Sequence, residues 1–466
     1  MNVRVKFLGG AKSVTGSKYL IQFEEPNFNI LVDCGLFQGK YELRRRNWDD
    51  FPVDPDTIDA IIITHGHLDH VGYLPRLIRQ GYDKKVYCSH PSKDLIAILL
   101  RDSAKLQENE AAFIAKKGYS KHKNPEPLYN QVDAERSIKL LESFCWSDPL
   151  KINDSLSVTF SDSGHILGSS ILTFILKGKD QTKRIVFSGD LGRYDQPVFN
   201  DPKTIESADI LFVESTYGNR DNIRRDTEAE IAEIVNDAYD KGGSIIIPAF
   251  AIGRTQLITY YVYDLMTKGK IPTMPIFVDS PMAQSVTKLY SKHPDWHRLD
   301  VSECCSVFDY EQIKYTNSAK ESKSINKMKK PCIIISASGM VTGGRILHHL
   351  FHRLPKENDT VLFVGYQAES SRGRRILNGE PTIKIYGEEV VVNCNVAQIS
   401  GLSAHADKSD LLRWLGEFKN TPKKTFIIHG EQESANELQK TLIEEKSWTN
   451  VIVPDYLQKE VLFTHV

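Results

Sequence analysis

The most constraining feature of this sequence is the segment Thr64-His65-Gly66-His67-Leu68-Asp69-His70, which directly follows the apolar run Ile61-Ile62-Ile63. The β-branched run predicts a buried strand, and four potential metal ligands follow it within six residues. Imidazole and carboxylate groups together suit zinc or another borderline divalent ion. Because the turn leaves the end of a strand, His65 and His67 can point to one side while Asp69 and His70 point to another. The segment therefore predicts two adjacent metal ions rather than a surface turn that merely carries histidines.

Composition sets the outer limits of the fold. With 466 residues, 41% of them hydrophobic and 26% charged, the chain predicts a globular protein of two or three domains. The charged N-terminus does not resemble a secretory leader and no apolar run approaches membrane-spanning length, so we expect a cytoplasmic protein without a membrane partner. Seven scattered cysteines without CxxC spacing predict reduced core residues. The formal net charge of -1 means that a nucleic acid would have to be bound by a local basic patch.

Strands that alternate with helices indicate an α/β architecture in the first part of the chain. Residues 3–8 and 18–23 predict a hairpin at the edge of a sheet. Asp33 ends a further predicted strand, where it is either a turn residue or the acceptor of a ligand histidine's free ring N–H. His165 follows another strand among small residues that let the backbone approach a metal, and Asp190, at a third strand end, has two oxygens with which to bridge two metals.

The ordered set Asp33, His65-x-His67-x-Asp69-His70, His165 and Asp190, each after a predicted strand, resembles the metallo-β-lactamase superfamily of dinuclear metallohydrolases. The resemblance implies an αββα sandwich with the metals at one edge of its two sheets. It also implies the ligand roles of His165 and Asp190, which periodicity alone does not single out. The superfamily fixes no substrate, because one fold supports many hydrolyses.

The rest of the chain extends this resemblance. From about residue 208 the sequence continues as a second α/β unit with a predicted parallel sheet. Glu214 ends an apolar run, and His405 and His429 each lie near the end of another one in the tail. These three residues match the acidic motif A and the histidine motifs B and C of the β-CASP branch, whose members cut nucleic acids. A histidine at motif C is typical of RNA-processing members, whereas DNA-processing members usually have valine there.

The match also predicts the domain boundaries. We expect a metallo-β-lactamase domain formed by residues 1–208 and 396–466, with an inserted β-CASP domain at residues 209–395. The motif Ser-Gly-Met-x-x-Gly-Gly-Arg at residues 338–345 resembles the cleavage and polyadenylation endonuclease group and its compact prokaryotic relatives.

The resemblance implies a two-metal hydrolysis of RNA. Two zinc ions, or manganese in their place, would hold a hydroxide and stabilise charge on the phosphate oxygens. In-line attack on phosphorus needs no 2′-hydroxyl, which predicts a 5′-phosphate and a 3′-hydroxyl. His405 is the expected general acid, with Glu214 holding its ring and raising its pKa, unless the two simply satisfy each other in the core. The resemblance implies His65, His67 and His165 as ligands of one ion, Asp69, His70 and His429 as ligands of the other, and Asp190 as a ligand of both. It also makes the Asp69 carboxylate part of the catalytic machinery.

Single-stranded RNA is the expected partner, because a scissile site enclosed by protein admits one strand but not a duplex. Guanidinium groups match phosphate oxygens, and a turn rich in glycine and hydroxyls can present backbone N–H groups to a phosphate. An arginine run is equally often a solvent-exposed face with no ligand, and glycine-rich turns are common connections between strands and helices. The candidate contacts in the inserted domain are Arg254, Ser338, Gly343, Gly344, Arg345, Arg372 and Arg375.

Cleavage is expected to be mainly endonucleolytic, with some 5′-exonuclease action. Three other functions stay open: a DNA nuclease of the same fold, a metallohydrolase acting on a small ester, lactam or thioester, and an RNA-binding scaffold. The large second domain and the pairing of His405 with Glu214 disfavour a small substrate, and the complete ligand set disfavours a scaffold. The sequence leaves the oligomeric state open, with a homodimer as one option.

Overall fold

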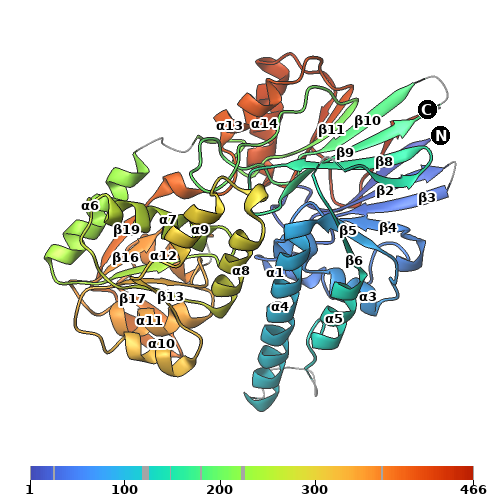
Figure 1. Cartoon of the computed structure of the whole chain (residues 1–466). Coiled ribbons are helices and arrows are strands. Elements are labelled where there is room, and N and C mark those ends of the chain that lie inside the picture. The colour runs from blue at the N-terminus through green and yellow to red at the C-terminus, as the bar shows by residue number, and fades with distance from the viewer. Residues whose placement is uncertain are drawn as a thin grey trace. The chain divides into compact units, whose positions relative to one another are not determined.

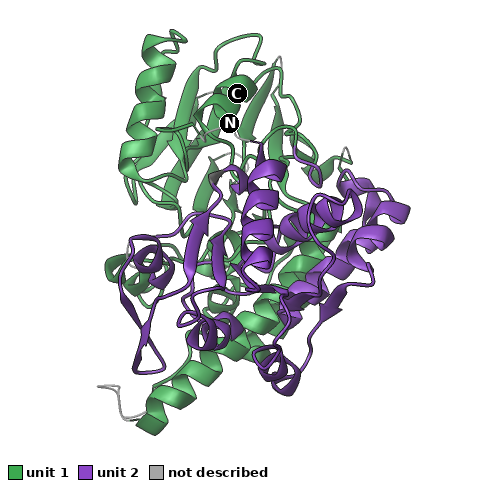
Figure 2. Ribbon diagram, turned by 90° about the vertical axis from the view of Figure 1, so that its left-hand side faces the viewer, with its two compact units in different colours: residues 1–195, 200–221, 405–466 green, residues 196–199, 222–404 purple. Residues whose placement is uncertain are grey.

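The computed structural model describes residues 2–24, 27–117, 125–146, 148–178, 181–221, 226–368 and 371–464. The chain divides into two compact units, green and purple in Figure 2: unit 1 comprises residues 1–195, 200–221 and 405–466, and unit 2 comprises residues 196–199 and 222–404. This division differs from the boundaries expected at 208 and 396: strand β11 (Ile210–Glu214) pairs with strands of unit 1, and β19 (Asn395–Gln398) pairs with β16 (Thr360–Phe363) of unit 2. Within the described ranges, no helix combines the length and the apolar character that crossing a bilayer requires.

Unit 1 contains two sheets of seven strands each within the described residues (Figure 1). The first sheet has the order β22 (Lys459–Phe463), β1 (Val3–Gly9), β2 (Lys18–Glu24), β3 (Asn27–Val32), β4 (Ala60–Ile62), β5 (Val86–Ser89) and β6 (Leu141–Phe144). The second has the order β21 (Val451–Ile452), β20 (Lys424–Ile428), β11, β10 (Thr182–Phe187), β9 (Ser170–Lys177), β8 (Leu156–Asp162) and β7 (Leu150–Asn153). The hairpin of β1 and β2 does not lie at the sheet edge as expected, because β22 pairs with β1 on its outer side.

The two sheets of unit 1 pack against each other through their apolar faces. Phe7 of β1 belongs to the same buried core as Phe212 of β11, and the rings of Phe7 and Phe426 are 5.2 Å apart. Helices α13 and α14 pack on the second sheet around the buried Trp414 and Leu438, and α4 lies against β5 and β6. The predicted αββα sandwich is therefore confirmed. The helices of this unit are α1 (Tyr41–Arg45), α2 (Leu68–Val71), α3 (Leu74–Arg79), α4 (His90–Lys117), α5 (Gln131–Leu140), α13 (Lys408–Leu415) and α14 (Gln432–Glu444).

Parallel strand pairs bring several loops of unit 1 to the same sheet edges. Strand β4 runs parallel to β3, with Ile62 beside Val32. Strand β11 runs parallel to both β10 and β20, and Glu214 lies beside Ile428. Because parallel strands end at a common edge, the loops that follow them are neighbours, and such edges are the usual position of active sites in α/β folds.

Unit 2 contains one six-stranded sheet within the described residues, and all its strand pairs are parallel, as the sequence predicts. Its order is β14 (Ile313–Tyr315), β13 (Ile276–Asp279), β15 (Ile333–Ser336), β12 (Ile245–Pro248), β16 (Thr360–Phe363) and β19 (Asn395–Gln398). A small antiparallel hairpin joins β17 (Thr382–Ile385) to β18 (Glu388–Val391). The helices are α6 (Thr227–Asp240), α7 (Arg254–Thr267), α8 (Pro281–Lys292), α9 (Val301–Phe308), α10 (Ala319–Ile325), α11 (Arg345–Arg353) and α12 (Arg372–Leu377).

The cysteines follow their predicted role in most positions. All seven are free, and five are buried. The expectation of a core position is wrong for Cys145 and Cys305, which are exposed.

Candidate active site

The predicted metal ligands all belong to unit 1 and follow its strands. Strand β4 is buried throughout, and the chain then turns into the short helix α2, which begins at Leu68. His65 and His67 precede this helix, whereas Asp69 and His70 lie on it. Two different backbone segments therefore present the two pairs of side chains.

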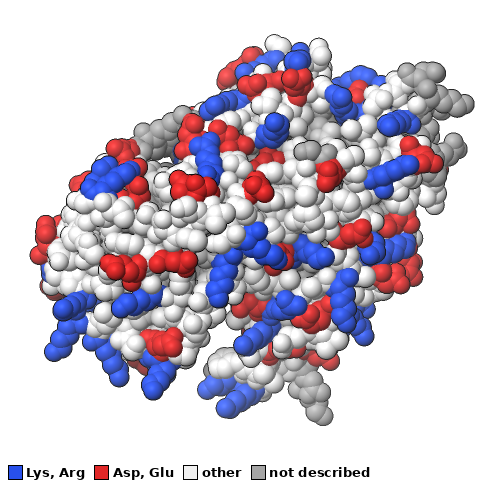
Figure 3. Space-filling view, in the orientation of Figure 1, with Lys and Arg blue, Asp and Glu red and all other residues white. Residues whose placement is uncertain are grey.

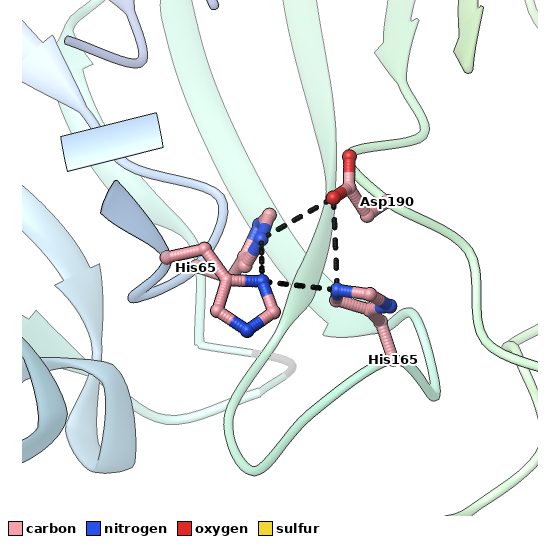
Figure 4. A group of neighbouring side chains, drawn as sticks. His65, His165 and Asp190 are labelled. Atoms are coloured by element: carbon pink, nitrogen blue, oxygen red, sulfur yellow. Dashed lines mark hydrogen bonds and ion pairs between the residues drawn. The ribbon is translucent and has the colours of Figure 1, made fainter. Parts of the chain in front are cut away.

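The first ligand group comprises His65, His67, His165 and Asp190, and Figure 4 shows His65, His165 and Asp190 turned toward one another. The Nδ1 atom of His67 is 3.1 Å from Nε2 of His65 and 3.1 Å from Nε2 of His165. The Oδ2 atom of Asp190 is 3.4 Å from the first of those Nε2 atoms and 3.6 Å from the second. A tetrahedral zinc ion with bonds of about 2.0–2.1 Å separates its ligand atoms by about 3.3 Å. These four atoms are therefore spaced like the ligands of one ion.

The second ligand group comprises Asp69, His70 and His429. The Nε2 atoms of His70 and His429 are 3.2 Å apart, and Asp69 Oδ2 is 3.4 Å from Nε2 of His429. His429 follows β20 with a φ of 46°, a conformation that residues other than glycine rarely adopt. Its backbone N–H donates to the carbonyl of Gly10 at 2.7 Å, which helps to hold this turn. A residue from the C-terminal part of the chain thus completes a group that begins on α2.

Asp190 lies between the two groups. Its Oδ2 atom faces the first group, and its Oδ1 atom is 3.2 Å from Nε2 of His70 and 3.4 Å from Nδ1 of His429. The residue is 1% exposed, and neither oxygen accepts a hydrogen bond in acceptable geometry from any described residue. A buried carboxylate without donors is costly unless a cation compensates it. The residues present therefore fit two metal ions with Asp190 between them.

A third cluster joins Glu214 and His405 to Asp190. Glu214 is fully buried, and its carboxylate accepts the backbone N–H of Leu191 at 2.7 Å and that of Thr216 at 3.2 Å. Its Oε1 atom is also 3.3 Å from Nδ1 of His405, whose side chain is 21% exposed. Because these donors already occupy the Glu214 carboxylate, we interpret the cluster as a carboxylate that orients the His405 ring rather than as a third metal site.

Three family models match this chain. They are the metallo-beta-lactamase superfamily at residues 14–137, the Beta-Casp domain at residues 255–376 and the Zn-dependent metallo-hydrolase RNA specificity domain at residues 389–454. Ribonuclease TTHA0252 from Thermus thermophilus is 35% identical over 450 residues, which cover 94% of this chain and 96% of that protein. The chain belongs to the β-CASP branch of the metallo-β-lactamase superfamily. The family predicted from the motifs is thereby confirmed.

Three further proteins are similar to this chain over most of its length. An RNase J-like protein from Methanocaldococcus jannaschii is 28% identical and the match covers 98% of each chain. The transcription termination factor FttA of the same organism is 29% identical, with 92% of this chain and 67% of that protein covered. A solved structure of a protein of unknown function from Enterococcus faecalis V583 has a TM-score of 0.55 at 14% identity and covers 99% of this chain and 100% of that one. That last likeness concerns the fold alone.

The electrostatics of this β-CASP site favour neutral imidazoles in the first ligand group. Burial lowers the pKa of His65 well below its ordinary value and lowers the pKa of His67 to about 4. Burial also acts on His70, but the carboxylates of Asp190 and Asp33 outweigh it and raise the pKa of that imidazole. A neutral imidazole has the lone pair that a metal needs, so His65 and His67 are prepared to bind without first losing a proton.

Asp33 lies where it can fix the ring of a ligand histidine. Its Oδ2 atom is 2.8 Å from Nδ1 of His70, which leaves Nε2 of that ring facing the ligand group. The backbone N–H of Thr64 donates to Asp33 at 2.7 Å, and the Thr64 hydroxyl is 2.9 Å from the same carboxylate. Burial raises the pKa of Asp33, although His70 and Thr64 act in the opposite direction. The carboxylate acts on the metal site through His70.

Two threonines of the site were not singled out from the sequence. The Thr64 hydroxyl is 3.1 Å from Nδ1 of His65 as well as contacting Asp33. The Thr216 hydroxyl is 3.2 Å from Nδ1 of His429. Thr64 directly precedes the histidine motif and Thr216 closely follows Glu214, so position next to a motif was the signal available. A hydroxyl in a loop is too common for that signal to stand alone.

The arginines predicted to contact RNA lie in unit 2, where the structure gives three of them partners within that unit. Arg345 donates through Nη1 to Asp279 at 2.7 Å. Arg372 donates through Nε to the carbonyl of Lys384 at 3.0 Å, and Arg375 donates to Glu380 at 2.8 Å. These contacts give each guanidinium a structural role, and contact with RNA stays a prediction.

The remaining RNA candidates form a turn and a helix start. The hydroxyl of Ser338 accepts the backbone N–H groups of Thr342 at 3.0 Å and Gly343 at 3.3 Å, which closes the turn. Gly344 has a φ of 82°, and a Cβ there would lie 2.6 Å from a backbone oxygen, so the turn requires glycine. Arg254 is buried at the start of α7. Their predicted role in RNA binding is likewise untested.

Proposed function

We propose that this protein is a zinc-dependent ribonuclease that hydrolyses phosphodiester bonds of single-stranded RNA, mainly within the chain and secondarily from the 5′ end. Two comparisons support RNA as the substrate: the match to an RNA specificity domain, and the 35% sequence identity to a ribonuclease over 94% of this chain. The observation that carries the proposal is Asp190, whose two oxygens each face a different group of imidazole nitrogens.

Two zinc ions account for the unsatisfied carboxylate and for the spacing of the nitrogens around it. When bound, the ions would supply an activated water and positive charge against the phosphate oxygens. Manganese is compatible with the same mixture of imidazole and carboxylate groups. The proposed ligands share Asp190 and are His65, His67 and His165 on one side, and Asp69, His70 and His429 on the other.

The chain positions these ligands through contacts that fix their rings. Asp33 accepts from Nδ1 of His70, and the Thr216 hydroxyl contacts Nδ1 of His429. Each contact occupies one ring nitrogen, so the other keeps its lone pair toward the ion. The site is thereby preorganised before RNA arrives.

His405 is the proposed proton donor to the leaving 3′-oxygen. Burial lowers the pKa of this imidazole, but the Glu214 carboxylate, at 3.3 Å from Nδ1, and the more distant Asp190 outweigh burial and raise the pKa to about 9. With Nδ1 held by Glu214, the proton that can reach the leaving group is the one on Nε2. The 2′-hydroxyl takes no part, so the products are a 5′-phosphate and a 3′-hydroxyl.

The decisive test presents one single-stranded RNA sequence in circular, 5′-capped and 5′-monophosphate forms to the purified protein, with and without chelator. Cleavage of the circular form that stops with chelator establishes endonuclease action. Stepwise loss confined to the monophosphate form assigns the activity to the 5′ end instead. A His67→Ala protein is the matched control for contaminating nuclease.

Further substrates separate the alternatives. Single-stranded DNA of the same sequence should be cut much more slowly than RNA, because His429 is the motif C histidine that is typical of RNA-processing members of the branch. A nitrocefin or thioester assay should remain silent. Metal-loaded protein that leaves every RNA form intact would exclude a ribonuclease, cleavage of the DNA alone would make it a DNA nuclease, and hydrolysis of the small substrates would assign the site to them.

A further inference from the structure

The outer surface of helices α10 and α11 in unit 2 is strongly basic. The segment 320–330 contains five lysines and one acid, Glu321. Lys323, Lys327 and Lys356, here called the lysine patch, are exposed, and none of the three forms an ion pair with a described residue. Figure 3 shows Lys and Arg side chains gathered over these two helices. The patch therefore presents positive charge that the protein itself does not neutralise.

Two acids of this region, Glu321 and Asp279, already have partners. Glu321 accepts the backbone N–H of Asn317 at 2.8 Å and takes part in the capping box at the start of α10. Asp279, next to both helices, is fully buried and paired with Arg345 and His349. Glu321 is nevertheless exposed, as is Glu357 beside Lys356 in the sequence. Residues 320–330 and 356–357 together expose six lysines against these two carboxylates, which leaves a net positive surface.

Helices α10 and α11 are bound together, which makes the patch a single surface. Arg353 of α11 donates through Nη2 to the carbonyl of Ile325 at the end of α10, at 3.1 Å. Partial burial lowers the pKa of His348, and Lys323 is among the neighbouring cations that lower it further. Lys356 acts in the same way on the pKa of His352. Lys323 of α10 and Lys356, which follows the end of α11, thus lie beside His348 and His352, two of the three histidines of α11.

A row of rings continues from these histidines. The ring centroids of His348 and His352 are 4.6 Å apart, those of His352 and Phe351 are 5.3 Å apart, and those of Phe351 and Tyr386 are 6.0 Å apart. Tyr386 follows β17 in the hairpin and is 62% exposed. An exposed tyrosine of this kind offers a flat face on which a nucleic-acid base can stack.

We propose that the lysine patch and Tyr386 form a second contact surface for single-stranded RNA, with phosphates on the lysines and a base stacked on the tyrosine. Lysine recognises phosphate as a point charge, and every base has a face for stacking, so this surface binds without sequence preference. The exposed ring favours RNA over an anionic lipid surface, which presents no base to stack. The inference rests on the proposed ribonuclease function, and none of its residues belongs to the ligand groups of unit 1.

The test measures binding of a fluorescently labelled oligouridylate of about 20 nucleotides, longer than one typical site, to the full-length protein with chelator present to stop hydrolysis. Lys323→Gln, Lys327→Gln and Lys356→Gln combined should weaken binding at least about tenfold near physiological salt. The slope of log affinity against log salt should fall by about 2, since each lost contact on a single strand removes about 0.7. The matched control combines Lys241→Gln, Lys268→Gln and Lys270→Gln, lysines of the same unit that lie in ion pairs, and should bind within about twofold of the unaltered protein.

Tyr386 provides a second, independent measurement. Tyr386→Ala should weaken binding about fivefold to tenfold, whereas Tyr386→Phe keeps the ring and should keep the affinity. In cleavage assays, the lysine-patch variant should raise KM for the long RNA with kcat unchanged. A tetranucleotide, which offers few phosphates to the patch, should be cut at the unaltered rate, which also shows that the variant is folded.

Equal RNA affinity in the lysine-patch and control variants would overturn the inference. So would loss of binding to vesicles of phosphatidylcholine and phosphatidylserine with RNA binding retained, because the patch would then be a lipid surface. The ribonuclease proposal fails separately, if the unaltered protein with metal cuts no RNA, and that failure does not alter the binding measured with chelator.

Discussion

Asp190 in unit 1 and Asp279 in unit 2 are both buried aspartates that follow or end a strand, but they differ in the hydrogen bonds that their carboxylates accept. Asp279 is 0% exposed and accepts hydrogen bonds from His349 at 2.6 Å, Ser322 at 2.5 Å and Arg345 at 2.7 Å. Asp190 is 1% exposed and accepts no well-formed hydrogen bond from a described residue, although four imidazole nitrogens lie 3.2–3.6 Å from its oxygens.

The difference shows how a structural carboxylate can be told from a ligand. Burial raises the pKa of Asp279, but its hydrogen-bond donors outweigh burial and hold that pKa well below the ordinary value. Its neighbours donate, so its charge is compensated within the fold. The neighbours of Asp190 are mostly imidazoles that offer lone pairs of their own, so a cation bound among them would compensate its charge. Burial alone would not have separated the two sites.

The sharpest way to break the comparison is to neutralise each aspartate in turn. Asp190→Asn should abolish detectable RNA cleavage and release divalent metal, because one amide oxygen cannot serve both ligand groups. Metal content by mass spectrometry of the purified protein and cleavage of a labelled RNA are the two measurements. Circular dichroism confirms that the variant is folded. A variant that keeps both ions and its activity would show that Asp190 is not shared between metals.

Removing His405 should give the next largest effect. The Glu214 carboxylate beside His405 accepts backbone N–H groups, as Asp279 accepts its donors, but it also lies in a cluster with Asp190. This pair is therefore intermediate between the structural Asp279 and the proposed ligand Asp190. His405→Ala should lower the cleavage rate about 10²- to 10⁴-fold with the metal content unchanged, because a general acid contributes about that much. Loss of metal from this variant would instead make His405 a ligand.

The same histidine predicts a pH dependence. An imidazolium donates its proton only below its pKa, which is raised to about 9 here, and nearby cations would lower that value. The cleavage rate should therefore fall as pH rises through a value at or below about 9. The pH profile of His405→Ala should lack this alkaline fall, and an identical fall in the variant would assign it to another group.

Asp279→Ala should act on stability rather than on metal binding. The substitution leaves the His349 and Arg345 side chains without their shared carboxylate, and removing one partner of a buried ion pair costs about 3–5 kcal/mol. Urea unfolding measures the loss, and Asp240→Ala, at an exposed position, should stay within about 0.5 kcal/mol of the unaltered protein. Metal content should not change. An unaltered unfolding midpoint would mean that the network around Asp279 contributes little.

The smallest effect is expected at Asp33, which touches a ligand but not the ions. Asp33→Asn should weaken metal binding about 10- to 100-fold, because it loosens the hold on Nδ1 of His70. Competition with a chromophoric chelator measures this change. If affinity is unaffected, the contact with His70 serves the fold alone, as it would for a simple turn residue.

The sequence predicted the αββα sandwich, the parallel sheet of the inserted unit and the family because these depend on short-range patterns. Apolar runs such as Ile61-Ile62-Ile63 predict buried strands. The metal-binding pattern of His65, His67 and Asp69 can likewise be recognised within a few neighbouring residues. His165 and Asp190 depended on the resemblance, because a lone histidine or aspartate at a strand end carries too little information by itself.

Only the tertiary structure decided how distant segments pair. It placed β11 in unit 1, put β22 outside the predicted edge hairpin, and gave Arg345 a buried partner in Asp279. It also directed the two oxygens of Asp190 to different groups of nitrogens. Strand partners and the donors around a buried charge come from residues far apart in the chain, so local patterns cannot specify them.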